Sequence, residues 1–266
     1  MNEPHNHYAP PTSRVADPSS GGGKGGPFIP NGRRVPLGRG VYWISESGRM
    51  FFRQPAKWIG VLAISILLML LPGFFPFLNV LGSVLVAFIF AGVALLADSQ
   101  RRTNDFVMGD LFKGFNLAPR ELAIVGVVMT LNSLVMFAVY TFYVGVDTAL
   151  AIVFGYGEAA ANTFQLADVW KGVFMSMVLA IPLYCVTYAA PQLVVLHGQS
   201  ATTAMKHSFS GLMRNLPAGI IYAVMMSALV VISALPLFIG LFITIPMYII
   251  GTYVAYRDIF VGDEPL

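Results

Sequence analysis

Charged residues are absent from four stretches of this chain, and these stretches define its pattern. Two of them are long, since residues 58–97 and 215–256 contain no Asp, Glu, Lys or Arg over 40 and 42 residues. Two shorter stretches cover residues 122–146 and 172–205. A helix needs roughly 20 predominantly apolar residues to cross the hydrocarbon core of a bilayer. Each long stretch therefore has room for two crossings, and each shorter stretch for one.

Turn-forming residues divide the two long stretches near their middles. The sequence Pro-Gly-Phe-Phe-Pro at 72–76 interrupts the first, and Pro236 and Gly240 interrupt the second. Proline breaks a helix, and both residue types favour turns. We therefore expect six transmembrane helices, at about 58–74, 78–97, 122–144 and 172–196, with two more inside 215–256. Pro182 predicts a kink in the fourth of them.

Amphipathic segments precede three of the predicted membrane segments, at 41–57, 104–116 and 200–215. Their apolar residues follow the helical spacing of three and four positions, with basic residues on the other side. Such segments are typical of short helices that lie in the membrane interface and face anionic headgroups. Ser200 is placed to cap the third helix.

Each amphipathic segment is followed by two predicted crossings, which indicates an internal repeat. Arg53 and Asp98 lie 45 positions apart, and Arg214 and Asp258 lie 44 apart. We therefore expect an all-α integral membrane bundle of six transmembrane helices, built from three repeated units of interfacial helix plus membrane hairpin. The alternative is that basic residues simply precede any membrane hairpin.

Composition supports a membrane protein rather than a soluble one. Apolar residues make up 56% of the 266 residues and charged residues 11%, about half the usual share of a soluble domain. Residues 1–40 differ, because they are rich in Pro, Gly, Ser and Asn and cannot bury enough apolar surface to order themselves. The predicted organisation is a disordered cytoplasmic tail at 1–40, a transmembrane domain at 41–260 and a short cytoplasmic tail at 261–266.

The distribution of basic residues predicts the orientation. Fifteen of the 16 Lys and Arg residues lie in segments on the same side of the predicted membrane as the amino-terminal tail, and only Lys171 lies on the opposite side. Basic loops stay in the cytoplasm. We therefore expect a multi-pass protein of the bacterial inner membrane with both termini cytoplasmic. The net charge of +3 does not predict a nucleic-acid partner, because the basic residues lie beside apolar runs and form no single basic surface.

Residues that could carry chemistry are few. Intramembrane sites usually hold ionisable groups, and the predicted helices hold almost none. The candidate polar residues of the bundle are Asn132, Gln192 and His197, which could line a pathway or bond neighbouring helices. We expect no catalytic, cofactor-binding or metal-binding residues, and no enzyme activity, because no nucleophile–base pair, phosphate loop or zinc motif is present.

Three short sequences occur together in this chain: DLFKGF at 110–115, APQLVVLHG at 190–198 and YRDIF at 256–260. In this order, between membrane hairpins, they resemble a family of polytopic bacterial inner-membrane proteins for which no activity is established. The resemblance covers about residues 40–260. It implies the topology and a bacterial origin, and it brings no catalytic residues.

Two functions are consistent with these features. The first is a non-enzymatic scaffold or accessory protein that interacts with membrane lipids and, as further expected partners, other membrane proteins or a second copy of itself. The candidate lipid-headgroup contacts are Arg49, Arg53, Lys57, Lys206 and Arg214. The alternative is a transporter or facilitator of a small or lipid-like solute, because repeated hairpins and proline-interrupted helices are common in transporters.

Overall fold

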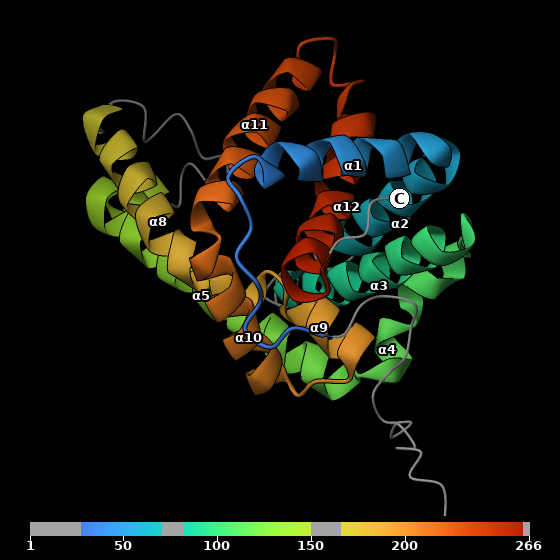
Figure 1. The fold of residues 1–266 in the computed structure, drawn as a ribbon. Helices are drawn as coiled ribbons and strands as arrows, with labels where there is room; N and C mark the ends of the chain where they lie inside the picture. Colours follow the sequence, from blue (N-terminus) through green and yellow to red (C-terminus); the bar gives the residue numbers. More distant parts are fainter. Residues whose placement is uncertain (1–27, 71–81, 150–165, 263–266) are drawn as a thin grey trace, which may run out of the picture.

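The computed structural model describes residues 28–70, 82–149 and 166–262, and every regular element within them is a helix (Figure 1). The predicted all-α class is confirmed for this part of the chain. In chain order the main elements are α1 (Arg39–Arg53), α2 (Pro55–Leu70), α3 (Gly82–Thr103), the 3-10 helix η3 (Met108–Phe112), α4 (Gly114–Leu117), α5 (Pro119–Val144), α8 (Leu166–Thr187), α9 (Ala190–His197), α10 (Ala201–Arg214), α11 (Leu216–Ala234) and α12 (Leu241–Phe260).

Four helices in the described ranges are long and apolar enough to cross a membrane, namely α3, α5, α11 and the combined length of α8 and α9. Helices α1 and α2 give a fifth if they count as one span, although they are bent by 101°. These spans suggest a multi-pass membrane protein. The count of six is not reached, because α2 has 16 residues before the described range ends at Leu70, and Arg257 and Asp258 reduce the mean hydropathy of α12. The predicted turn at 72–76 lies outside the described residues.

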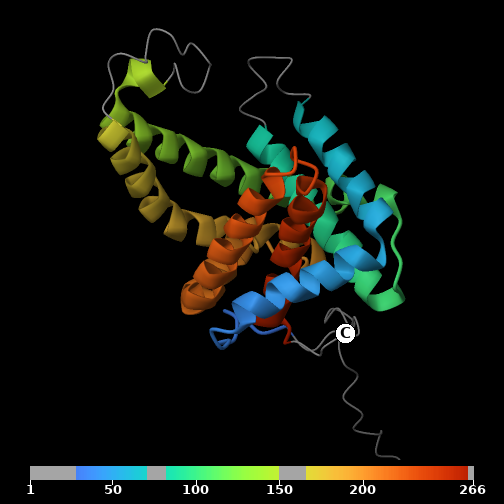
Figure 2. The same ribbon diagram turned by 90° about the horizontal axis from the view of Figure 1, so that it is seen from above.

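The helices have two distinct sides (Figure 2). Helix α1, the segment before it and the end of α12 lie on one side. The ends of α2 and α5 and the beginnings of α3 and α8 lie on the opposite side, which the turn between α11 and α12 also approaches. The hairpins therefore point in the same direction.

Helix α3 is the centre of the bundle. Half of its apolar span (50%) is buried inside the protein, compared with 17% for α5 and for α11. It packs against α5, α9 and α12. Two glycines allow close approaches to α3: a Cβ at Gly92 would overlap the carbonyl oxygen of Leu111 in η3, and a Cβ at Gly126 of α5 would overlap the Cα of Val84.

Helix α1 is amphipathic and lies across α11 and α12. Its apolar face buries Trp43, Met50 and Phe51. The predicted single helix over 41–57 is interrupted at Gln54, because Pro55 begins α2 and the residue before a proline is disfavoured in helical conformation. The basic residues predicted to share one side of this segment are therefore divided between two helices at 101° to each other.

The other two predicted amphipathic segments differ in regularity. Residues 104–116 form no single helix, and η3 is separated from the short α4 by a turn at Lys113. The third segment forms α10 as predicted, but the cap assigned to Ser200 is wrong. Its hydroxyl makes no capping bond to the backbone. Instead the Glu121 carboxylate of α5 accepts from the Ala201 N–H at 2.6 Å, where a negative charge also suits the helix dipole.

Helices α8 and α9 are separated by a break that was not predicted from the sequence. Helix α8 continues through Pro182, the residue of the predicted kink, and ends at Thr187. The break comes at Tyr188 and Ala189, just before Pro191, whose ring clashes with a helical carbonyl four residues back. The Ser208 hydroxyl of α10 fills the interrupted ladder, because it accepts from Ala189 N–H at 3.0 Å and donates to the Cys185 carbonyl at 2.7 Å.

Residues 28–38, here called the strap, run along the end of α12. The N–H of Ile29 donates to the Phe260 carbonyl at 2.7 Å, and the N–H of Arg33 donates to the Ile259 carbonyl at 2.8 Å. Phe28 lies against Phe260 and the rings of two histidines. These tertiary bonds hold residues 28–38, which lie inside the predicted tail at 1–40, against α12.

The three short segments pack in a cyclic order. Helix α1 packs on α11 and α12, the η3 segment packs on α2 and α3, and α10 packs on α5 and on the span formed by α8 and α9. The second and third predicted amphipathic segments therefore lie against the two spans that precede them in the chain, and the first lies against the last two helices.

Candidate functional site: an apolar cavity between α8 and α11

A cavity of about 600 Å³ lies between α8 and α11. Its walls come mainly from these two helices, with contributions from α12, the end of α10 and Trp43 of α1. Ligand cavities typically have volumes of 300–1,000 Å³ and are mostly apolar. The volume is therefore large enough for a small molecule or for a single hydrocarbon chain.

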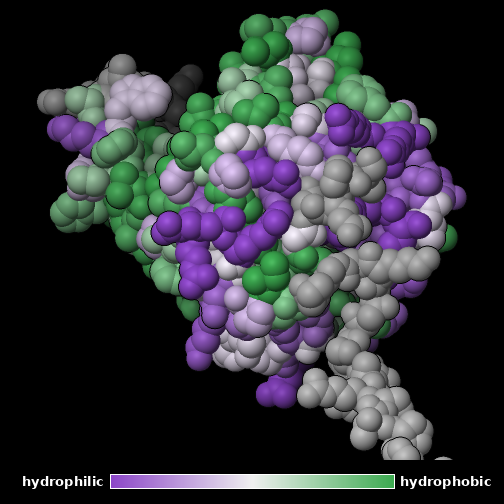
Figure 3. All heavy atoms as spheres, viewed as in Figure 1, coloured by the Kyte–Doolittle hydropathy of each residue, from purple (hydrophilic) through white to green (hydrophobic). Residues whose placement is uncertain are grey.

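The cavity is open at one side because α8 and α11 hardly touch each other. They are closest near α10 and diverge from there (Figure 1). Both are helices with the length and hydropathy of membrane spans. Apolar residues cover α8 and the outer end of α11, while hydrophilic residues gather over the strap and α1 (Figure 3). The opening therefore faces the part of the surface that is suited to hydrocarbon.

Tyrosines form the polar part of the cavity wall. The hydroxyls of Tyr184 and Tyr248 lie 2.9 Å apart, and the Tyr222 hydroxyl donates to the Tyr248 carbonyl at 3.0 Å. Tyr188, whose ring lies 5.2 Å from that of Tyr184, makes no hydrogen bond through its hydroxyl to the described residues. The wall thus combines a large aromatic surface with one hydroxyl group that is available to a ligand.

Gly219 leaves the cavity open along α11. A Cβ at this position would meet no atom within 4 Å. Cys185 on α8 contributes a thiol to the opposite wall. Neither residue carries a charge, and the described residues that line the cavity include no Asp, Glu, Lys, Arg or His. The site is consequently suited to binding an apolar molecule.

Asn215 lines the cavity and bonds to the strap. Its amide oxygen accepts from the Val35 N–H at 2.8 Å, and its amide nitrogen donates to the carbonyls of Arg33 and Gly211, both at 2.8 Å. Asn215 is only 3% exposed. The strap is therefore fixed directly to a residue of the cavity wall.

Asp258 provides the second attachment of the strap. This carboxylate is fully buried, and it accepts from Arg33 Nη2 at 2.5 Å, from Arg39 Nε at 2.6 Å and from Trp43 Nε1 at 2.8 Å. Trp43 in turn packs edge-on against Tyr222, with 5.9 Å between their ring centroids. One carboxylate thus connects the strap, α1 and α12 to the aromatic wall of the cavity.

The polar bundle residues predicted from the sequence lie outside the cavity. The Asn132 amide donates to the Leu183 carbonyl at 3.0 Å and bonds α5 to α8. Gln192 is fully buried, and with its amide turned it donates to the Tyr188 and Ala189 carbonyls at the break, at 3.0 and 3.2 Å. His197 bonds the Tyr256 hydroxyl at 2.5 Å. The structure brings none of the three together.

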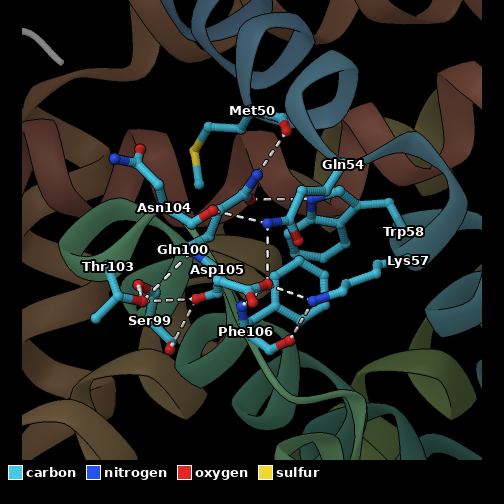
Figure 4. Close-up of polar contacts among 10 residues, drawn as sticks. All are labelled: Met50, Gln54, Lys57, Trp58, Ser99, Gln100, Thr103, Asn104, Asp105 and Phe106. Carbon is cyan, nitrogen blue, oxygen red and sulfur yellow. Dashed lines mark hydrogen bonds and ion pairs between the residues drawn. The ribbon is translucent and has the colours of Figure 1, made fainter.

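The basic residues predicted to contact headgroups fall into two groups. Arg53 is the last residue of α1, and Lys57 lies in the first turn of α2 (Figure 4 shows Lys57). Lys57 forms an ion pair with Asp105 and donates to the Phe106 carbonyl at 3.0 Å, and Arg53 donates to Asn104 at 3.3 Å. The hydrogen bond from Lys57 holds the pKa of Asp105 at about 2, so the pair persists through neutral and mildly acidic pH.

Beside this ion pair, a buried set of bonds fixes the bend between α1 and α2. The Trp58 indole N–H donates to Gln100 of α3 at 3.0 Å, and the Gln100 amide donates to the Met50 carbonyl at 2.8 Å (Figure 4). Arg49 is paired within α1, to the buried Glu46, at 3.2 Å. The first group of basic residues therefore has partners inside the protein.

The second group lies on α10. Lys206 and Arg214 are exposed, and Arg214 donates to the Gly32 carbonyl of the strap at 3.2 Å. Arg214 directly precedes Asn215, so it lies at the strap end of the cavity, whereas Lys206 lies two turns earlier. Of the five predicted headgroup contacts, Arg214 is the one beside the cavity.

Sequence reasoning did not find the cavity. The signal it could have used is the spacing of Tyr184 and Tyr188, which places two aromatic residues on one helix face, together with Gly219 and Ala223 at the same spacing on α11. Nothing in that pattern shows that the two faces diverge. Among the described residues, no three His, Cys, Asp or Glu side chains are grouped closely enough to hold a metal ion.

Comparison with known proteins gives no relative for this chain: no family model, no curated protein and no solved structure matches it.

Proposed function

We propose that this chain is a non-enzymatic, multi-pass membrane protein that binds a lipid-like molecule in the cavity between α8 and α11. The observation that carries the proposal is the cavity itself, which is apolar, uncharged and open between two helices of membrane-span character. A molecule that enters between these two helices comes from the bilayer, because both helices have the length and hydropathy of membrane spans. The aromatic wall favours a hydrocarbon chain, and the hydroxyl of Tyr188 offers it one polar contact.

The proposal includes a topology of six crossings in three units. Helices α2 and α12 supply the two crossings beyond the four clearest spans. The cyclic packing of α1, η3 and α10 supports the three units, since each short segment lies on a different helix pair. With the basic residues on the side of the strap and α1, this topology places both termini in the cytoplasm of a bacterial cell and the hairpin tips outside its inner membrane.

A transporter or facilitator of a lipid-like solute is the second candidate. The feature that favours it is the break between α8 and α9 at Tyr188, because interrupted helices beside a cavity are common in transporters. Asn132 and Gln192 do not line that cavity. A role as scaffold or accessory subunit uses the same site if the bound lipid joins this protein to a membrane partner or a second copy.

The test is to fill the cavity. Gly219→Phe places a ring where a Cβ meets no atom within 4 Å, so the helix accepts it while the cavity volume falls. Val224→Phe on the same helix adds the same ring at an exposed position outside the cavity and serves as the control. We expect native mass spectrometry to show bound lipid on the wild type and on Val224→Phe and loss of most of it from Gly219→Phe. Equal lipid retention by all three proteins would contradict the proposal.

A further inference from the structure

We infer that the molecule in the cavity carries an anionic headgroup, a phosphate or a carboxylate, which Arg34 and Arg214 bind at the strap end. This inference rests on the proposed function and specifies the class of ligand. The ligand's hydrocarbon chain lies along α11 inside the cavity. Its anionic headgroup binds to two arginines that do not line the cavity.

Asn215 brings the two arginines close to the cavity. Arg214 directly precedes Asn215 in the chain. The residues on either side of Arg34 bond to the Asn215 side chain, through the carbonyl of Arg33 and the N–H of Val35. The backbone of Arg34 therefore lies beside Asn215, which is part of the cavity wall. Both arginines consequently flank one end of the cavity.

The side chains of Arg34 and Arg214 are available to a ligand. Arg33 bonds to the buried Asp258, whereas Arg34 is exposed and makes no hydrogen bond or ion pair to the described residues. Arg214 is also exposed, and within the described ranges its side chain makes one bond, from Nη1 to the Gly32 carbonyl.

The charge balance at this end favours an anion. Among the described residues, Asp258 is the carboxylate bonded to the strap, and Arg33 and Arg39 both pair with it. Arg34 and Arg214 form no ion pair within the described ranges, and guanidinium groups bind phosphate and carboxylate in bidentate geometry. From Leu216 to Val231, α11 rises roughly 22 Å beside the cavity, about the reach of one acyl chain from the headgroup level to the middle of the bilayer.

The experiment measures headgroup selectivity of the full chain. The protein is purified from vesicles that contain equal amounts of phosphatidylglycerol and phosphatidylcholine with identical chains, and retained lipids are counted by native mass spectrometry. We expect retained phosphatidylglycerol to exceed phosphatidylcholine about tenfold, because each basic residue near the membrane favours an anionic lipid several-fold. The double variant Arg34→Gln/Arg214→Gln should retain both lipids equally, and Lys206→Gln, which removes a charge from the same helix, should keep the wild-type ratio.

The outcomes separate this inference from the proposed function. Loss of lipid in Gly219→Phe together with an unchanged ratio in the double arginine variant would overturn the inference and leave the proposed function intact. A matched vesicle experiment with a fatty acid distinguishes a carboxylate from a phosphate, and either selective result supports the inference. Displacement of the lipid by inorganic phosphate alone would overturn it, because the site would then recognise a free anion.

Discussion

At the scale of single residues, side chains replace backbone bonds that the helices lack. Ser208 occupies the gap in the α8–α9 ladder, where it bonds both the Ala189 N–H and the Cys185 carbonyl. Glu121 does the same at the start of α10 by accepting from Ala201. An unpaired backbone group buried in protein or hydrocarbon costs much more than an exposed one. These two side chains therefore determine where the helices can be interrupted.

Replacing Ser208 by Ala should destabilise the protein by about 1–3 kcal/mol, because two buried backbone groups lose their partner. Ser210→Ala on the same helix is the control, since Ser210 makes no hydrogen bond to the described residues. Thermal unfolding in detergent provides the measurement. If both variants unfold at the same temperature, Ser208 does not support the break.

The residue scale is also where the sequence was least informative. Ser208 lies 23 positions from Cys185, and Asn215 lies 180 positions from Val35. A pattern of hydropathy contains no information on such pairs, because each side chain has the composition of an ordinary helix or turn residue. The same reason explains why Ser200 was assigned the cap that Glu121 provides.

At the scale of elements, local patterns performed better. The free energy of transferring a side chain into hydrocarbon depends mainly on the residue type. The charge-free stretches therefore predicted α5 and α11 to within a few residues. The kink predicted at Pro182 lies inside the continuous α8, and the break before Pro191 was not predicted. The strap was missed because its order comes from Asp258 and Asn215. The cavity was missed because it depends on the angle between two helices.

The attachment of the strap depends on charge. Asp258→Asn keeps the shape of the side chain and removes the negative charge that holds Arg33 and Arg39. We expect the variant to lose about 2 kcal/mol of stability and to exchange the amide hydrogens of residues 28–38 faster than the wild type.

Asp110→Asn is the control for this measurement. It removes the ion pair with Lys113, which is partly exposed and spans one helical turn, so it should cost little. Hydrogen exchange read by mass spectrometry compares the two variants. Unchanged protection of residues 28–38 in Asp258→Asn would show that backbone bonds alone hold the strap.

At the scale of the whole molecule, the turn between α11 and α12 indicates what surrounds the protein. Leu235, Leu237, Phe238 and Ile239 are all at least 65% exposed there, and Leu237 and Phe238 adopt positive φ angles. An apolar tip of this kind would promote aggregation in water. The tip approaches the side of the molecule opposite to α1 and the strap. This position is consistent with hairpins that cross the bilayer and end at the opposite interface.

Cysteine labelling tests this topology. In a Cys185→Ala background, Leu37→Cys in the strap, Leu117→Cys in α4 and Leu237→Cys at the tip each place an exposed thiol. An impermeant maleimide should label Leu237→Cys only in right-side-out vesicles and the other two only in inverted vesicles. Labelling of Leu37→Cys and Leu237→Cys from the same side would exclude the proposed arrangement.

The cyclic packing has a consequence for biogenesis. Helix α1 precedes all the other helices in the chain, yet the surface it covers belongs to α11 and α12, which follow all of them. In the proposed topology, α1 would therefore remain at the membrane surface during synthesis, with Trp43 and Met50 not yet covered by α11 and α12, until the last hairpin has inserted. An amphipathic helix can wait there because the headgroup region accepts its apolar face. We expect the strap and Asp258 to form their bonds last, so that assembly of this protein is completed in one late, cooperative step.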